Sequence, residues 1–449
     1  MTSRLLHRQL ARIAGVVALL WAATGFLHPV MTWTAPRPAV QAPPVQSLAL
    51  DGLVPPATAL AAQGLRESAL VRLVMVGGAP YWFAADGIGE RVVVDARSGA
   101  RAQGMEQRHA VSLARHYAGL PQSEVAQARL ISAFSTDYPS VNRLLPVWEV
   151  RLATPDGLTL YVDTGLDRLA AVTNDQRRVL LGVFQNVHTL KFLEFVEPLR
   201  IAIILVLIGS VLATAVFGGL LLWKARGKGV RRVHALVGWV TLPLLLMFTL
   251  SGLLHLVMTS AFMTPPLPSA AQFRLADLTS PPGAEAGIPV DELSATAGVN
   301  EAPVWRLQVQ ESGYYSGPNA PDTDAGLARF LAQAPSESAV SVVRRFGDGY
   351  GFINKRLPVW RVETPGGPVY VDVREGLIAA SPPATWLSHV EGWTFANLHK
   401  WEFLNPLGRF NRDLATMAAA AIIIVSSILG LLLVLRSRRR SDFGPGQDR

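Results

Sequence analysis

The sequence predicts a membrane protein: a four-helix transmembrane bundle formed by internal duplication, with two α+β domains on the outer side of the membrane. Three observations predict this fold class, namely an apolar composition, four long apolar runs and a repeat that relates the two halves. Of the 449 residues 50% are hydrophobic, and the mean hydropathy is +0.28. This mean hydropathy is high for a soluble enzyme and indicates several membrane spans separated by polar domains.

The four apolar runs predict the membrane spans. They cover about residues 13–33, 199–223, 233–259 and 414–435. Each contains about 20 residues or more, enough to cross ~30 Å of hydrocarbon as a helix. The first run is long and continues into Trp33, so we expect a retained anchor and not a cleaved signal peptide.

These spans divide the chain into eight expected segments. In order they are a cytoplasmic N-terminus with the first span (1–33), an outer domain (34–196), the second span (197–223), a basic cytoplasmic loop (224–232), the third span (233–259), a second outer domain (260–412), the fourth span (413–436) and a basic cytoplasmic tail (437–449). Within the outer domains, residues 69–76, 80–85, 90–97, 145–153, 158–163 and 168–172 are predicted strands, and residues 105–118 are a predicted amphipathic helix. Pro- and Ala-rich residues 34–58 and 264–285 are predicted linkers.

The net charge of +8 reports membrane topology. Basic residues gather in three clusters without acids: Arg4, Arg8 and Arg12; Lys224, Arg226, Lys228, Arg231 and Arg232; and Arg436, Arg438, Arg439 and Arg440. With four spans all three clusters fall on one side, which the positive-inside rule identifies as cytoplasmic. We therefore expect a multi-pass protein of the bacterial inner membrane with both termini inside. Lipid is an expected partner, and nucleic acid is not.

Short segments of the first half recur in the second half. Leu145-Pro146-Val147-Trp148 recurs as Leu357-Pro358-Val359-Trp360, Tyr161-Val162-Asp163 as Tyr370-Val371-Asp372, and Asn186-Val187-His188 as Asn397-Leu398-His399. In the spans, His28-Pro29-Val30-Met31-Thr32 corresponds to His255-Leu256-Val257-Met258-Thr259. The order of span, outer domain and span therefore occurs twice.

Six of the nine histidines form three repeat-related pairs: His7 with His234, His28 with His255, and His188 with His399. The first pair lies at the cytoplasmic ends of spans one and three, and the other two pairs lie at the outer ends of spans. His7 and His28 are three heptads apart, a spacing that keeps both on one seam of a left-handed bundle. Imidazoles at matching depth on facing helices are what bis-His haem ligation requires.

Other roles for these histidines stay open at this point. A histidine near a helix end can lie at headgroup level and hydrogen-bond lipid or water. The same residues could ligate zinc or copper, but no nearby acids complete a first shell. His109, His116 and His389 have no repeat partner and are expected to be solvent-facing or structural.

The absence of cysteine restricts the redox chemistry. It excludes disulfides, iron–sulfur clusters and covalent c-type haem, so any haem is held non-covalently by His, Met or Tyr. No nucleophile elbow, phosphate loop or dinucleotide fingerprint occurs. The cytoplasmic loops are too short to hold a nicotinamide or flavin site.

At these residues the chain resembles PepSY-associated transmembrane proteins. The family's "His-Arg-x-x-Gly … Thr-Gly" helix is similar to Val233-His234-Ala235-Leu236-Val237-Gly238 with Leu250-Ser251-Gly252-Leu253, and its copy is His7-Arg8 with Thr24-Gly25. The family's Leu-His motif is similar to Val187-His188 and Leu398-His399. The PepSY strand pair is similar to Val359-Trp360-Arg361-Val362 with Val369-Tyr370-Val371-Asp372. The resemblance covers nearly the whole chain. The family includes inner-membrane reductases of ferric siderophores, with two b haems in a four-helix bundle, and iron-regulated proteins of unknown activity.

The resemblance implies haem b and electron transfer from a cytoplasmic or quinol donor to a periplasmic ferric chelate. It carries over His7, His234, His188 and His399 as ligands; repeat symmetry adds His28 and His255. Whether the outer side holds one haem or two stays open, so we expect two haems or three. Arg12, Arg200 and Arg409 are candidate partners for haem propionates, or stop-transfer charges.

Two other functions compete with electron transfer. One is a non-enzymatic regulator or binding module of the PepSY type, which predicts no haem and explains the histidine pairs poorly. The other is a metal or ferric-chelate transporter. At mid-membrane the spans lack the buried acids and the Gly or Pro breaks that mark substrate paths, with Pro243 as the one exception.

Overall fold

The chain divides into two units, one helical and one rich in β-sheet. The computed structural model describes residues 3–45, 47–48, 50–85, 91–223, 228–261, 267–282, 290–298, 301–310, 312–317, 320–347, 349–382 and 385–442, without the side chains of residues 261 and 437–442. Unit 1 comprises Met1–Ala35, Gln176–Pro265 and Pro383–Arg449, and unit 2 comprises Pro36–Asp175 and Pro266–Pro382. Lys224 and Arg226 of the predicted basic loop lie outside the described residues.

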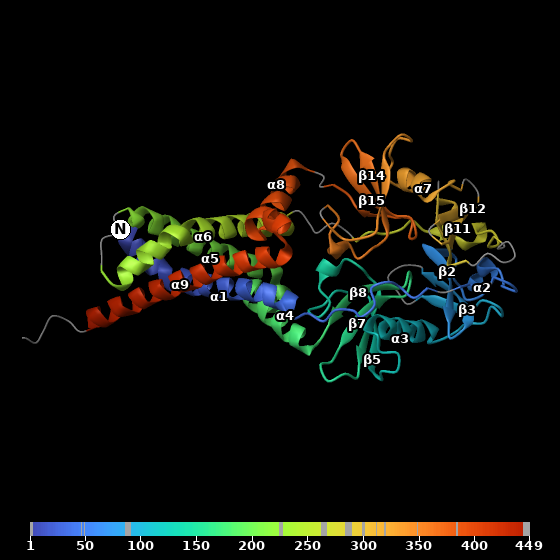
Figure 1. Ribbon diagram of the computed structural model, residues 1–449, viewed down its shortest axis with the longest axis horizontal. Coiled ribbons are helices and arrows are strands. Elements are labelled where there is room, and N and C mark those ends of the chain that lie inside the picture. The colour runs from blue at the N-terminus through green and yellow to red at the C-terminus, as the bar shows by residue number, and fades with distance from the viewer. Residues whose placement is uncertain are drawn as a thin grey trace, which may run out of the picture. The chain divides into compact units, whose positions relative to one another are not determined.

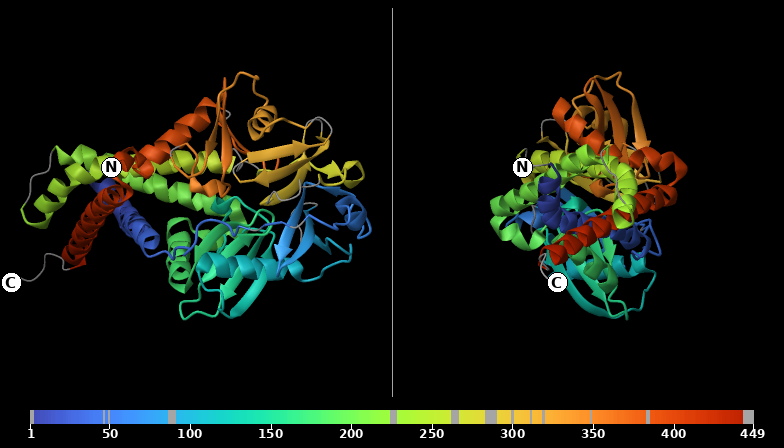
Figure 2. Two further views of the ribbon diagram at one scale, coloured as in Figure 1. Left: turned by 45° about the vertical axis from the view of Figure 1, so that its right-hand side comes forward. Right: turned by 90° about the vertical axis from the view of Figure 1, so that its left-hand side faces the viewer.

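Unit 1 is a bundle of four long helices. They are α1 (Ser3–Trp33), α5 (Glu197–Leu222), α6 (Val230–Ala261) and α9 (Arg409–Asp442). All four are long and apolar enough to cross a membrane. Both α1 and α6 pack against α5 and α9, so α1 and α6 occupy opposite corners of the bundle (Figures 1 and 2). A side chain from each of them can therefore meet across the bundle interior.

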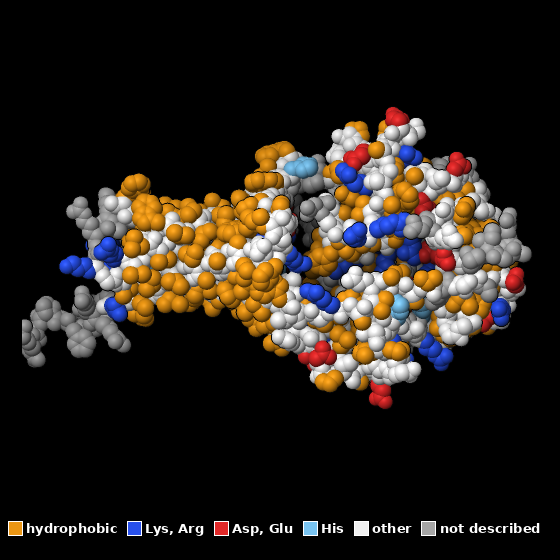
Figure 3. Space-filling model, in the orientation of Figure 1, with side chains coloured by type: hydrophobic (Ala, Val, Ile, Leu, Met, Phe, Trp, Pro, Cys, Tyr) orange, Lys and Arg blue, Asp and Glu red, His pale blue; other side chains and the backbone are white. Residues whose placement is uncertain are grey.

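Small residues allow the helices of the bundle to approach closely. Ala14, Ala18 and Ala22 of α1 are buried, and Ile423 of α9 packs with Ala18 and Ala22. Close packing of small side chains is the usual stabilisation between helices in lipid. Hydrophobic side chains cover most of the bundle face that Figure 3 shows, and Lys and Arg gather at the end that holds the N-terminus. We call this the basic end of the bundle and the opposite one the far end.

Short helices cover the far end. The segment α4 (Asp175–His188) and the 3₁₀ turn η2 (Lys191–Val196) precede α5; α8 (Trp386–Thr394), the π-helical turn η6 (Phe395–His399) and η7 (Glu402–Leu407) precede α9. The Ser388 amide donates to the Thr385 hydroxyl (3.2 Å), which caps α8. Residues 176–196 and 383–412, expected within the outer domains, thus belong to the helical unit.

Unit 2 contains three antiparallel sheets of four or more strands. The six-stranded sheet has the order β12 (Ser312–Ser316), β11 (Pro303–Val309), β10 (Glu292–Ala297), β2 (Leu70–Val76), β3 (Ala79–Ala85) and β4 (Val92–Asp95). One four-stranded sheet consists of β5 (Val125–Ile131), β6 (Val147–Leu152), β7 (Thr159–Asp163) and β8 (Arg168–Thr173); the other consists of β13 (Val340–Val343), β14 (Val359–Thr364), β15 (Gly367–Asp372) and β16 (Leu377–Ala380). A two-stranded ribbon pairs β1 (Glu67–Ser68) with β9 (Phe273–Arg274). The short helix α2 (Pro56–Ala61) precedes β1 in the sequence.

Each four-stranded sheet has its own helix. The helix α3 (Met105–Ala118) buries Ala110, Leu113, Ala114 and Tyr117, spaced so that one face packs on β5–β7. It ends at Gly119 in the left-handed conformation (φ 66°), which an L residue rarely adopts. The helix α7 (Asp324–Leu331) packs in the same way on β13–β15. The α+β expectation therefore holds for both halves.

The two halves are joined and do not form separate outer domains. The six-stranded sheet takes β2–β4 from the first half and β10–β12 from the second, with Leu73 of β2 opposite Leu293 of β10. Trp82 and Trp305 are fully buried beneath this sheet, with ring centroids 5.9 Å apart. Since each half of the chain supplies part of one core, unit 2 is not divided into two domains.

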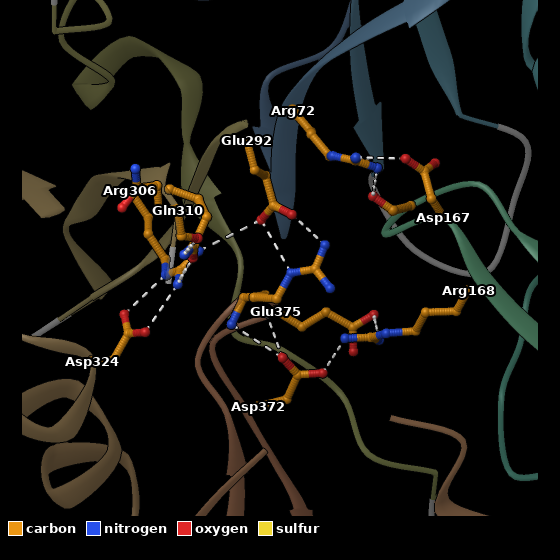
Figure 4. A network of polar contacts seen from close by, with 12 residues as sticks. Arg72, Asp167, Arg168, Glu292, Arg306, Gln310, Asp324, Asp372 and Glu375 are labelled. Atoms are coloured by element: carbon orange, nitrogen blue, oxygen red, sulfur yellow. Dashed lines mark hydrogen bonds and ion pairs between the residues drawn. The ribbon is translucent and has the colours of Figure 1, made fainter. Parts of the chain in front are cut away.

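The opposite face of the six-stranded sheet carries a buried ionic network (Figure 4). Arg168 of β8 pairs with Asp372 of β15, and Arg72 of β2 pairs with Asp167 (2.6 Å). Burial alone raises the pKa of the Glu292 carboxyl, but Arg374 and Arg72 lower it to about 2. Buried charges are tolerated only when they are paired. The network therefore ties the three sheets together.

Candidate functional site

A cavity of about 870 Å³ opens among all four helices at the basic end of the bundle. His7 of α1 and His234 of α6 both line it, from opposite corners of the bundle. The volume lies within the ~300–1,000 Å³ typical of pockets for small molecules and cofactors. The structure thus brings together the first predicted histidine pair.

The His7 ring is held by α5. Its Nδ1–H donates to the Thr214 carbonyl oxygen (3.0 Å), so Nε2 keeps the lone pair that a metal needs. Gly218, one turn further along α5, leaves room for the ring, because a Cβ there would lie 3.0 Å from His7 Cε1. Both contacts come from a neighbouring helix, so they fix the ring only in the assembled bundle.

The His234 ring has a similar setting on α9. A Cβ at Gly430 would lie 3.3 Å from His234 Cε1. Unlike His7 Nδ1, His234 Nδ1 is buried without a hydrogen-bond partner among the described residues. Thr214 and Ser426 are 212 positions apart, as are Gly218 and Gly430. No chemical motif marks these four residues in the sequence, and their common offset is the one signal that relates them.

The residues that line the cavity suit an apolar group that carries carboxylates. Apolar or small residues line its depth: Ala14, Gly15, Ala18, Val211, Leu242 and Leu245. Arg4, Arg8, Arg231 and Arg232 line it as well, and no acid is present among the described lining residues. A porphyrin with two propionates has this chemistry, since guanidinium groups bind carboxylates in a forked geometry.

The three arginines proposed for propionates have other positions. Arg12 is exposed and does not line the cavity, because five residues from His7 is about 140° around the helix. Arg200 Nε donates to Glu197 (2.7 Å), and Arg409 lies 4.0 Å from Asp413. The arginines that line the cavity are Arg4, Arg8, Arg231 and Arg232.

At the far end, His188 and His399 have matching hydrogen bonds. His188 Nδ1 lies 2.9 Å from Thr24 Oγ1, and His399 Nδ1 lies 3.2 Å from Ser251 Oγ. Each hydroxyl already donates to a backbone carbonyl of its own helix, so we assign the imidazole Nδ1–H as the donor. Nε2 of both rings then remains free to bind a metal. Thr24 and Ser251 belong to the Thr-Gly motif positions noted in the sequence.

Aromatic rings fix the orientation of these two imidazoles. Phe184 stacks on His188 with centroids 4.8 Å apart, and Phe395 stacks on His399 at 5.0 Å. Burial lowers the pKa of His188 to about 3, and the nearby His399 lowers it as well; burial lowers the pKa of His399 to about 4. Both rings are therefore neutral at physiological pH, the form that ligates iron.

His28 and His255 lie close to this pair, but in settings that differ from each other. His28 is exposed and tilted against Phe184, with centroids 5.5 Å apart. His255 Nδ1 is 2.6 Å from Glu391 Oε1, and the His255 ring stacks on Phe395. Only His188 and His399 have equivalent supports at the far end.

The geometry favours a metal that needs two protein ligands. No group of three or more His, Cys, Asp or Glu that could hold a bare metal ion occurs within the described part of the chain. The porphyrin supplies four ligands to haem iron, so a facing histidine pair completes its coordination. The residues present therefore fit haem better than zinc or copper.

The remaining histidines have structural or solvent-facing positions. His109 is buried in unit 2 and bonds to Asp167 through Nε2. His116 Nε2 lies 2.9 Å from the Ala42 carbonyl oxygen. His389 is exposed on α8. None of the three lines the cavity at the basic end.

The family model of the PepSY-associated TM region matches residues 4–436. The chain belongs to this family. The match spans all four long helices and unit 2, so the PepSY-associated assignment applies to the architecture as a whole. No curated protein matches the chain. Together with the four apolar helices, the family membership identifies a transmembrane protein that contacts lipid.

Proposed function

We propose that this PepSY-associated protein is an inner-membrane haem b protein that passes electrons across the membrane to a periplasmic acceptor, a ferric siderophore or another ferric chelate. Its two halves arose by duplication. The observation that carries the proposal is the meeting of His7 and His234 across the cavity at the basic end, with Gly218 and Gly430 beside the two rings.

Two histidine pairs would hold two haems. His7 and His234 would ligate one at the basic end, and His188 and His399 would ligate the other at the far end. The bound haems supply one-electron redox chemistry. Thr24, one of the hydroxyl acceptors at the far end, is 17 positions after His7 in α1, about 26 Å along the helix. One pair thus lies near each surface of the membrane.

The surrounding residues would orient the histidine rings, exclude water and supply positive charge for the haem propionates. The Thr214 carbonyl and the Thr24 hydroxyl hold the His7 and His188 rings with Nε2 free. Apolar helix faces exclude water, which stabilises the ligated geometry and tunes the potential. Arg8 and Arg231, together with Arg4 and Arg232, offer cations to propionates at the basic end.

Charge asymmetry supports the orientation in the membrane. Arginines lie at the basic end of α1 and α6, which the positive-inside rule assigns to the cytoplasm. Both chain termini then lie inside, and unit 2 lies in the periplasm. In this orientation a quinol or cytoplasmic donor reduces the protein, and the ferric chelate is reduced outside.

The test is a single-turnover reaction of the purified full-length protein. The protein is reduced anaerobically and mixed with a ferric chelate in the presence of a ferrous-iron trap. We expect a b-type spectrum that reoxidises as the ferrous complex forms. A protein without a b-type spectrum would favour the regulator, and a reduced haem that is not reoxidised by any ferric chelate would exclude the reductase activity.

A further inference from the structure

The short helix α8 at the far end of the bundle exposes an apolar face. Trp386 is 75% exposed, Val390 is 41% exposed and Trp393 is 61% exposed. Intervals of four and three positions place these side chains on one side of a helix, and the exposed His389 lies between them. We call Trp386, His389, Val390 and Trp393 the tryptophan face. Exposed apolar patches of this kind mark a protein or membrane contact.

The contact of α8 with α6 gives its depth along the bundle. Glu391, on the other side of α8, has Oε1 2.6 Å from His255 Nδ1 of α6. His255 is 23 positions after Arg232 in α6, about 35 Å along the helix. The hydrocarbon layer of a bilayer is ~30 Å thick, and the headgroup layers bring the total to ~40–45 Å. With Arg232 among the headgroups at the basic end, α8 lies at headgroup level at the far end.

The composition of α8 suits this level. Indole rings concentrate at the membrane–water interface, where the ring contacts acyl chains and the N–H group reaches the headgroups. The helix contains no Lys, Arg or Asp, and its one Glu, Glu391, is directed to His255. His389 can remain in contact with interfacial water while its neighbours contact lipid. The tryptophan face therefore suits the headgroup layer better than water or hydrocarbon.

Exposed apolar side chains continue along the chain from α8 into the spanning helix α9. They are Phe403 and Leu407 of η7 and Phe410 of α9. The positions 211 residues earlier, at the start of α5, are also apolar and exposed: Phe192, Val196 and Leu199. In Figure 3 hydrophobic side chains lie over α8 as well as over the long helices. Both junctions lead into a membrane span, so lipid is the surrounding that they share.

The equivalent helix of the first half has a different surface. At the positions of Trp386 and His389, α4 has Asp175 and Arg178. Charged side chains of this kind favour water. The tryptophan face is therefore a feature of α8 and not of the repeat.

We propose that α8 is an interfacial helix whose tryptophan face inserts into the lipid headgroup layer at the far end of the bundle. Such helices lie in the plane of the membrane with their apolar face in the layer between headgroups and acyl chains. Because α8 continues directly into η6, which carries His399, the lipid contact also positions this histidine. The inference concerns lipid binding and does not depend on the haem assignment.

The test uses the absence of cysteine from the chain. Val390→Cys is labelled with a nitroxide in the full-length protein, which is reconstituted into vesicles of phosphatidylethanolamine and phosphatidylglycerol. Electron paramagnetic resonance compares collisions of the label with oxygen, which concentrates in lipid, and with a nickel chelate, which stays in water. The matched control is Leu120→Cys, an apolar position of unit 2 that is 38% exposed, and Val206→Cys, exposed on α5, is the lipid reference.

We expect the ratio of oxygen to nickel collisions at Val390→Cys to lie between those of the two reference positions. A ratio no higher than that of Leu120→Cys would overturn the inference, because the tryptophan face would then lie in water. Low collision rates with both reagents, together with dipolar broadening between labels, would also overturn it and would indicate that a second copy of the chain covers the face.

The role of the indoles is tested in the same background. Trp386→Gln combined with Trp393→Gln should lower the ratio at Val390→Cys toward that of Leu120→Cys, because the helix loses the side chains that hold it in the headgroup layer. The ratio at Val206→Cys should not change, which controls for the integrity of the bundle. An unchanged ratio at Val390→Cys would overturn the assignment of the tryptophans as the lipid contact.

Discussion

The two ends of the bundle hold their histidines by different means. At the basic end, His7 donates to a backbone carbonyl, and a glycine of the next helix leaves room for the ring. At the far end, His188 and His399 donate to side-chain hydroxyls and are stacked on phenylalanines. A backbone acceptor cannot be removed by mutation, whereas a hydroxyl can. The support of the histidines at the far end can therefore be changed by substituting a side chain. The support of His7 at the basic end depends on the spacing between helices.

The largest expected effect is the loss of one redox centre at one end. His234→Ala should abolish one of two midpoint potentials in a spectroelectrochemical titration and leave the other, because His234 would hold the haem at the basic end only. His188→Ala should abolish the complementary one.

His28→Ala and His255→Ala distinguish the ligands at the far end. Both variants should keep two redox centres, since neither residue shares the setting of His188 and His399. Loss of a centre in His28→Ala, with His188→Ala unaffected, would reverse our assignment of the pair.

The second effect concerns the hydroxyl acceptors of the far end. Thr24→Val removes the acceptor of His188 Nδ1 and should weaken haem retention there about 10–100-fold, as measured by haem transfer to apomyoglobin. Thr24→Ser keeps the hydroxyl and should behave as wild type. Equal retention in Thr24→Val and Thr24→Ser would show that the hydroxyl does not support the ligand.

The third effect concerns helix spacing at the basic end. Gly218→Ala places a methyl group 3.0 Å from His7 Cε1 and should weaken the basic-end haem, at a cost of about 1–3 kcal/mol for overpacking. Gly209→Ala, in the same helix with open space around it, is the matched control. The same haem-transfer assay applies, and a weakened far-end haem in Gly218→Ala would contradict the separation of the two ends.

The smallest effect distinguishes the ends by charge. Arg231→Gln should lower the midpoint potential of the basic-end centre by about 10–40 mV, because an exposed cation that favours the reduced state is lost. The far-end potential should not move. A shift of both potentials by the same amount would mean that Arg231 acts through the overall field of the protein.

Local patterns made the four long helices, α3 and six of the first eight strands predictable. The spans follow from apolar runs longer than any soluble helix requires, and residues 105–118 form α3, as predicted from apolar spacing. The pairing of β2 with β10 was not predictable, because the two strands are more than 200 positions apart and either is a plausible edge strand alone. The prediction of two separate outer domains was wrong because this pairing joins strands of both halves in one sheet.

Helical geometry explains which site residues the sequence indicated. The three-heptad spacing placed His28 on the same seam as His7, but a straight helix drifts by about 20° per heptad, and His28 is exposed. Arg12 does not line the cavity because its side chain is about 140° around α1 from His7. Gly218 and Gly430 were missed because a glycine in an apolar run carries no chemical signal; only its contact with a ring on another helix gives it a role.

The central claim is most directly tested by counting haem in the purified full-length protein. A pyridine haemochrome assay, combined with protein quantification by amino-acid analysis, gives the number of b haems per chain. We predict two per chain in the wild type and one in His7→Ala. A wild-type value of zero would contradict the haem proposal, and a value of one that persists in His7→Ala would contradict a redox centre at the basic end.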